Sequence, residues 1–165
     1  MYIFMEPSQI VLKLVLDNLG VSNSITEVDD RKRIQKAVYL AQAAGVNLSY
    51  VFGWYVMGPY SPALTRDYYS LASALEASDK GHEGKSLRPE LQGKLESLQP
   101  LIEPPPGIRL SQEKWLELLA SIHFLQTVSK FDEKAARAVI AKEKASLVPF
   151  YDNGKNALLS ANLLQ

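Results

Sequence analysis

Serine, histidine and carboxylate side chains are the groups in this sequence that could do chemistry, and their spacing decides which reactions are open to it. Ser61 follows Gly58-Pro59-Tyr60 and precedes Pro62. This pattern is typical of a helix N-terminus, where backbone N–H groups can hold an oxyanion. Helix capping explains the same serine, because its oxygen accepts a hydrogen bond from the first turn. No base stands near Ser61 and no G-x-S-x-G motif occurs, so capping is the favoured interpretation.

The histidines and acidic residues do not form a pattern of metal ligands. The chain has no cysteine and only two histidines, His82 beside Glu83 in a polar segment and His123 at the edge of an apolar stripe. Asp29 and Asp30 are adjacent, so they do not share one face of a helix, and capping explains them better. We therefore expect no metal, no cofactor and no enzymatic activity.

A cationic cluster is the second candidate site. Arg31, Lys32, Arg33 and Lys36 lie within six positions, whereas the whole chain balances 18 basic against 18 acidic residues. A balanced chain has no overall field that attracts nucleic acid or anionic lipid. The cluster is therefore either a solvated helix face or a local binding site for phosphates or an acidic partner.

Aromatic residues gather in the middle of the chain. Seven of them lie between Tyr50 and Tyr69. Most must contribute to the core, but tyrosines at its edge could form a recognition surface, because they bury a large area at a low entropic cost.

The first half of the chain predicts three helices and one strand to position these groups. An apolar stripe after Pro7 predicts a helix that stops at Gly20. Asp29 or Asp30 is expected to cap a second helix, which Gly45 closes. The aromatic and β-branched residues of 50–56 predict a strand. Gly58-Pro59 then breaks it, and a third helix starts at Ser61.

The second half predicts further helices after a polar loop at 77–88. Pro89 starts one of them, and the proline-rich stretch 100–107 is expected to be extended and stiff. Ser111 and Asp132 are expected to cap the next two helices, and a last one follows Pro149. The predicted fold is mainly α, with one or two short strands: a helical region 1–99, a connector 100–107, and C-terminal helices 108–165 that pack on the first region.

Two motifs resemble a known bacterial pattern. The helix sequence K-R-I-Q-K-A-V-Y-L-A-Q at 32–42, followed by Tyr50-Val51-Phe52, and the turn Gly58-Pro59-Tyr60-Ser61-Pro62 with Leu64 resemble those of the YwgA-like uncharacterised proteins and, more distantly, the Panacea (SocA-like) antitoxin domain. Met57 stands where the usual turn has a tyrosine. The match covers about residues 10–76. The resemblance implies a winged-helix-like N-terminal half and a role in binding a partner protein, which in the Panacea case is a toxin.

These observations together predict a non-enzymatic protein-binding module, antitoxin-like or part of a phage-defence or mobile-element locus. The residues expected to bind the partner are Arg33, Gln35, Lys36, Tyr39, Tyr60 and Ser61. The alternative is a winged-helix DNA-binding regulator that would use Arg31, Lys32, Arg33 and Lys36. A second copy of the chain is a further candidate partner. No apolar run approaches the roughly 20 residues of a membrane helix, so we expect a cytoplasmic protein without a membrane partner.

Overall fold

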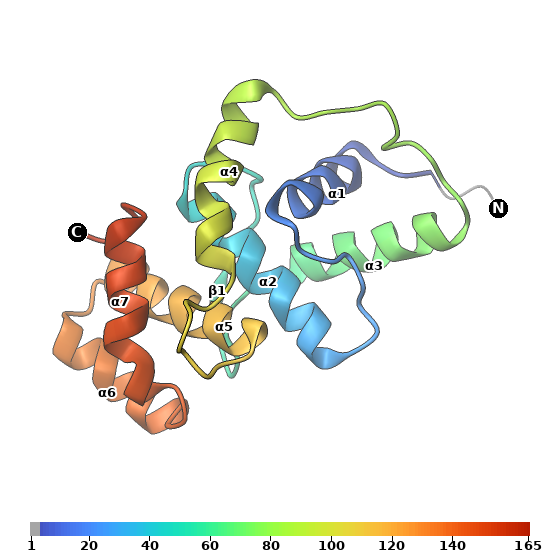
Figure 1. The fold of residues 1–165 in the computed structure, drawn as a ribbon. Coiled ribbons are helices and arrows are strands. Elements are labelled where there is room, and N and C mark those ends of the chain that lie inside the picture. Colours follow the sequence, from blue (N-terminus) through green and yellow to red (C-terminus); the bar gives the residue numbers. More distant parts are fainter. Residues whose placement is uncertain (1–3) are drawn as a thin grey trace.

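The structure, a computed structural model, describes residues 4–165 and is mainly helical, as predicted (Figure 1). The first three positions of the predicted region 1–99 lie outside the described residues. The described part contains seven α-helices, one π-helix, one short 3-10 helix and a two-stranded antiparallel sheet. Their bounds are α1 Pro7–Leu19, α2 Val28–Ala43, β1 Gly53–Tyr55, β2 Gly58–Tyr60, α3 Pro62–Glu76, α4 Pro89–Ile102, α5 Gln112–His123, the π-helix Phe124–Val128, α6 Glu133–Glu143, the 3-10 helix Val148–Phe150 and α7 Tyr151–Ser160.

Helices α2 and α5 form the centre of the molecule and pack against each other. Helix α1 packs against α3 and α4 on one side, and α7 packs against α5 on the other (Figure 1). The apolar stripe of α5 is buried, and the indole of Trp115 donates a hydrogen bond to the Leu101 carbonyl, 2.9 Å away. Helix α5 therefore contacts both α2 and the end of α4.

Helix α2 starts earlier than predicted. Its N-cap is Glu27 rather than Asp29 or Asp30, and the helix begins at Val28. The Asp30 carboxylate accepts a hydrogen bond from the Glu27 backbone N–H at 3.0 Å, as the third residue of a capping box. Asp30 thus acts from inside the first turn, so the predicted cap was wrong by two or three positions.

The sheet is a hairpin rather than the single strand predicted over 50–56. Only Gly53–Tyr55 forms a strand, and it pairs with Gly58–Tyr60, the segment predicted to break the strand. The amide side chain of Gln42 explains the shorter strand, because it bonds both the N–H and the carbonyl of Tyr50. A proline in β2 is tolerated because a two-stranded sheet leaves one side of each strand unpaired.

The proline-rich connector also differs from its prediction. Helix α4 continues through Pro100 to Ile102, so the first part of 100–107 is helical rather than extended. Leu101 and Ile102 are buried in the core. The burial of these two side chains offsets the helical hydrogen bond that is missing because Pro100 has no backbone N–H.

Several predicted helix ends are confirmed. Gly20 ends α1 with a φ of 72°, and Ser61 and Asp132 cap α3 and α6 by accepting hydrogen bonds from Leu64 and Ala135. The hairpin lies between α2 and α3, and in the described segment 77–88 no strand follows α3 as a wing. Within residues 4–165, no helix has the length and hydropathy needed to cross a membrane.

Candidate functional site

A pocket of about 260 Å³ lies where α2, the hairpin and α3 meet, and we call it the α2–α3 pocket. It collects five of the residues that the sequence singled out, together with a methionine, a valine, a threonine and two further tyrosines. Its lining residues are Val28, Arg31, Lys32, Gln35, Lys36, Met57, Tyr60, Thr65, Tyr68 and Tyr69. This is the place in the structure where the cationic cluster and the aromatic cluster meet.

Gln35 joins α2 to the start of α3. Its amide nitrogen donates to the Ser61 carbonyl and to the Thr65 hydroxyl, both at 3.0 Å, and its oxygen accepts from the Ser61 N–H at 2.9 Å. Gln35 and Ser61 are both buried. The polar groups of Gln35 and Ser61, which the sequence predicted to contact a partner, are therefore already engaged inside the protein.

Lys36 is buried to a degree unusual for a lysine. Its side chain is 1% exposed, and its ammonium group donates to the Pro59 carbonyl at 2.7 Å. Burial lowers the pKa of Lys36 to about 7; the Glu117 carboxylate opposes this shift, and the charges of Lys144 and Lys32 add to it. Lys36 is thus part of the interior rather than of a solvated helix face, which corrects its assignment to an open cationic surface.

The Glu117 carboxylate lies between two further lysines. It accepts from Lys32 and from Lys144, each at 2.8 Å, and Lys144 also donates to the Val56 carbonyl at 2.8 Å. Burial acts to raise the pKa of Glu117, but the hydrogen bonds from the two lysines outweigh it and leave the pKa below its ordinary value. Lys36 in α2 and Lys144 at the end of α6 thus donate hydrogen bonds to hairpin carbonyls on either side of Gly58, those of Pro59 and Val56.

The buried ammonium of Lys36 predicts a pH dependence of stability. Between its folded pKa of about 7 and the ordinary lysine value of 10.5, the unfolded chain binds more protons than the folded one. The free energy of unfolding should therefore rise with pH across this window, by up to about 1.4 kcal/mol per pH unit from this group. Lys36→Met should remove that slope in urea unfolding at about pH 7, 8 and 9.

The matched control for this prediction is Lys142→Met, which changes an exposed lysine on α6. The Lys142→Met protein should keep the slope of the wild type. Parallel pH profiles for the wild type and Lys36→Met would contradict a titration of Lys36 near neutral pH.

Tyr39 belongs to the core as well. Its hydroxyl lies 2.7 Å from His123 Nδ1, and its ring meets Phe52 edge-on with 5.2 Å between the ring centroids. Burial lowers the pKa of His123 and raises the pKa of Tyr39, so both groups are neutral at pH 7. The structure therefore places Tyr39, which the sequence predicted to contact a partner, in the core, and a core-edge role for His123 is confirmed.

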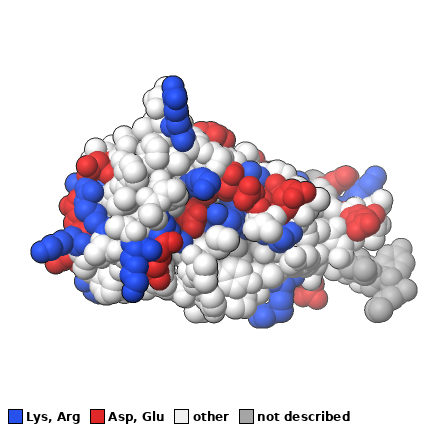
Figure 2. Space-filling model, turned by 90° about the horizontal axis from the view of Figure 1, so that it is seen from below, with Lys and Arg blue, Asp and Glu red and all other residues white. Residues whose placement is uncertain are grey.

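The remaining cations of the cluster are engaged in different ways. Arg33 pairs with Asp30 at 3.0 Å and with Glu113 at 3.3 Å, while Arg31 donates to the carbonyls of Ile25 and Thr26. Figure 2 shows one face of the molecule, where cationic and anionic side chains are interspersed rather than separated. On the face shown there, the basic side chains therefore do not form one continuous patch.

Exposed apolar side chains surround the α2–α3 pocket. Val56 at the hairpin turn is 87% exposed and Met57 is 45% exposed, and the ring of Tyr55 lies 5.1 Å from that of half-buried Tyr60. Val28 and Tyr69, which line the pocket, are exposed as well. The aromatic cluster in the sequence already included Tyr55 and Tyr69, but sequence reasoning missed Val56 and Met57 because it placed Val56 in a strand; a hairpin turn at Val56-Met57 would have indicated that these two residues are exposed.

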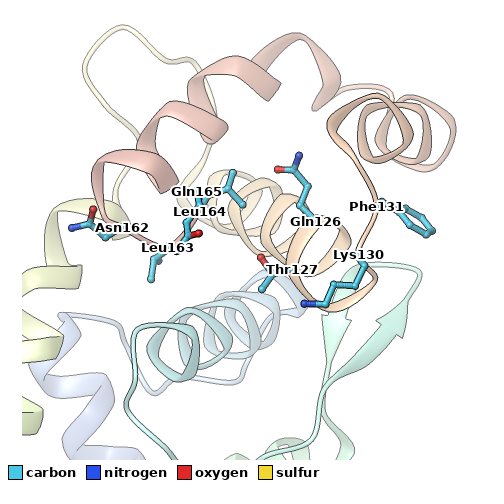
Figure 3. A pocket seen from close by; sticks show the side chains of 8 residues that line it. All are labelled: Gln126, Thr127, Lys130, Phe131, Asn162, Leu163, Leu164 and Gln165. Atoms are coloured by element: carbon cyan, nitrogen blue, oxygen red, sulfur yellow. The ribbon is translucent and has the colours of Figure 1, made fainter.

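A second pocket, of about 430 Å³, lies between the π-helix and residues 162–165 (Figure 3). Gln126 lines it, and the side-chain oxygen of Gln126 is buried without a hydrogen-bond partner. Figure 3 shows Phe131 pointing away from the other labelled side chains. None of the predicted site residues lines this pocket.

The structure gives the Ser61 hydroxyl a capping role. The side chain is fully buried, and its oxygen accepts from the Leu64 N–H at 3.3 Å. Within residues 4–165, no three His, Asp or Glu side chains converge in a way that could hold a metal ion.

The two motifs that carry the family resemblance are joined in space. Gln35 and Lys36 of the helix motif bond the backbone at Ser61 and Pro59 of the turn motif. This contact gives a physical reason for the two motifs to occur together, because the buried polar groups of each motif form their hydrogen bonds with the other motif. No family model, no curated protein and no solved structure matches this chain.

Proposed function

We propose that this chain is a non-enzymatic protein-binding module whose partner docks on the α2–α3 pocket and the apolar side chains around it. The observation that carries the proposal is the gathering of Val28, Tyr55, Val56, Met57 and Tyr69, all exposed, beside a pocket lined by tyrosines. Apolar side chains grouped around a pocket are typical of interaction sites, where aromatic residues and methionine contribute most.

The resemblance to the Panacea domain extends this proposal to an antitoxin-like role. In that role the partner would be a toxin encoded in the same phage-defence or mobile-element locus, and binding would take place in the cytoplasm. Of the residues predicted to bind the partner, Gln35, Lys36 and Tyr60 line the pocket. Val28, Met57 and Tyr69 join them in the proposed surface, whereas Tyr39 and Ser61 are buried outside its lining.

The test compares two double variants in affinity purification from the native host. Val28→Asp with Met57→Asp places charge on the proposed surface, whereas Val128→Asp with Phe131→Asp makes the same change elsewhere. Val28 and Val128 are equally exposed, at 54%. Recovery of the partner should fall at least about tenfold for the first pair, because an aspartate buried against an apolar partner surface loses its hydration.

The second double variant should recover the partner as the wild type does. If only the Val128→Asp and Phe131→Asp protein lost the partner, the result would contradict the proposed surface and place the binding site near the π-helix. Recovery of nucleic acid without protein, abolished at higher salt, would favour the DNA-binding alternative. Recovery of a second copy of the chain alone would identify the partner as the protein itself.

A further inference from the structure

The lining of the α2–α3 pocket carries positive charge that no acidic side chain of the lining balances. Arg31, Lys32 and Lys36 line it, and none of its other lining residues is an aspartate or glutamate. The chain as a whole has equal numbers of basic and acidic residues, so this excess is local. A concave site with cations of one sign focuses its field on a ligand of the opposite sign.

Two of these cations have no ion-pair partner within the described residues. Arg31 donates only to the backbone carbonyls of Ile25 and Thr26, and Lys36 donates only to that of Pro59. Lys32 does form an ion pair, but with Glu117, which it shares with Lys144. Three lysines therefore surround one carboxylate.

Burial makes this imbalance costly. Lys36 is almost completely removed from water, and a buried ammonium is stabilised mainly by a counterion. Glu117 already accepts hydrogen bonds from two other lysines. An anionic group that entered the pocket would supply the missing negative charge.

The size and the uncharged lining of the pocket indicate what carries that anion. A volume of about 260 Å³ lies below the roughly 300–1,000 Å³ of typical small-molecule sites and is open to the surrounding apolar surface. The Tyr60 hydroxyl accepts from Thr65 at 2.7 Å, which leaves its own proton available for an acceptor in the pocket. One short acidic side chain of a larger partner fits this arrangement.

We propose that the α2–α3 pocket receives the carboxylate of an aspartate or glutamate from an acidic segment of the partner protein, with apolar residues on either side of that acid. The proposal rests on the function proposed above and specifies the partner's chemistry. The carboxylate accepts hydrogen bonds from Arg31 and Tyr60 and acts as the counterion of Lys36. The flanking apolar residues cover Val28, Met57 and Tyr69.

The test presents the full-length protein with a display library of random peptides about 12 residues long. We expect the selected peptides to share one Asp or Glu at a fixed distance from an apolar residue. Binding of a selected peptide should weaken at least about tenfold when its acid is changed to the amide, or when Arg31→Gln is introduced, because a charge-assisted hydrogen bond is lost. Arg109→Gln, an exposed change of the same charge, is the matched control and should leave binding unchanged.

The outcomes separate this inference from the proposed function. Peptides that bind the wild type, fail on the Val28→Asp and Met57→Asp protein, and lack a shared acid would overturn the acidic-segment proposal while supporting the binding surface. Peptides that bind the wild type and that double variant equally would overturn both proposals. Equal loss of binding with Arg31→Gln and Arg109→Gln would assign the effect to overall charge and contradict the pocket.

Discussion

Glu117→Gln is expected to lower the free energy of unfolding by about 3–5 kcal/mol, because it leaves buried lysines without their carboxylate. Glu117 is buried and accepts hydrogen bonds from Lys32 and Lys144 at 2.8 Å. Removing one partner of a buried ion pair costs more than the pair contributes, since the remaining charges stay out of water. Urea unfolding at neutral pH measures the loss directly.

The chain offers a matched control on its surface. Glu133 also lies between two cations, Arg137 at 3.0 Å and Lys155 at 3.1 Å, but its side chain is 41% exposed. Glu133→Gln should change stability only slightly, because water replaces the lost interactions. Equal losses for Glu117→Gln and Glu133→Gln would show that burial of the lysine cluster is not what makes Glu117 important.

Gly58→Ala is expected to destabilise the protein by about 3 kcal/mol, from backbone strain and crowding together. Gly58 has a φ of 87°, a conformation that favours glycine, and a Cβ added there would lie 2.8 Å from the Ser121 Oγ. Because Gly58 follows Met57 directly, a shift that relieves this contact would also move the hairpin turn. Thermal or urea unfolding reports the loss of stability.

The control for Gly58→Ala is Gly107→Ala. Gly107 has nearly the same φ, 89°, but a Cβ there would have no heavy atom within 4 Å. Gly107→Ala should therefore lower the free energy of unfolding only by the backbone strain, about 1–2 kcal/mol. Ser121→Ala should restore part of the stability of the Gly58→Ala protein, since it removes the crowding oxygen. A Gly107→Ala protein that is as unstable as Gly58→Ala would assign the whole effect to backbone conformation.

The helix ends show what the sequence by itself determined about this protein. Gly20, Ser61 and Asp132 act at the positions predicted for them, because a cap is a contact between residues three or four positions apart. The mainly helical class follows from the same local periodicity. The cap of α2 was misplaced because the capping box uses Glu27 and Asp30 reciprocally, and several acidic residues there fit the same pattern.

Only the tertiary structure decided which predicted site residues are buried and which lie at the surface. A lysine that belongs to a cluster of four basic residues within six positions normally lies in solvent, but Lys36 is buried and donates its hydrogen bond to the Pro59 carbonyl. Likewise, Tyr39 is held in the core by His123, a residue 84 positions away. The α2–α3 pocket arises where α2, the hairpin turn and α3 converge. Local periodicity carries no information about such convergence, because it depends on which distant segments satisfy each other's buried polar groups.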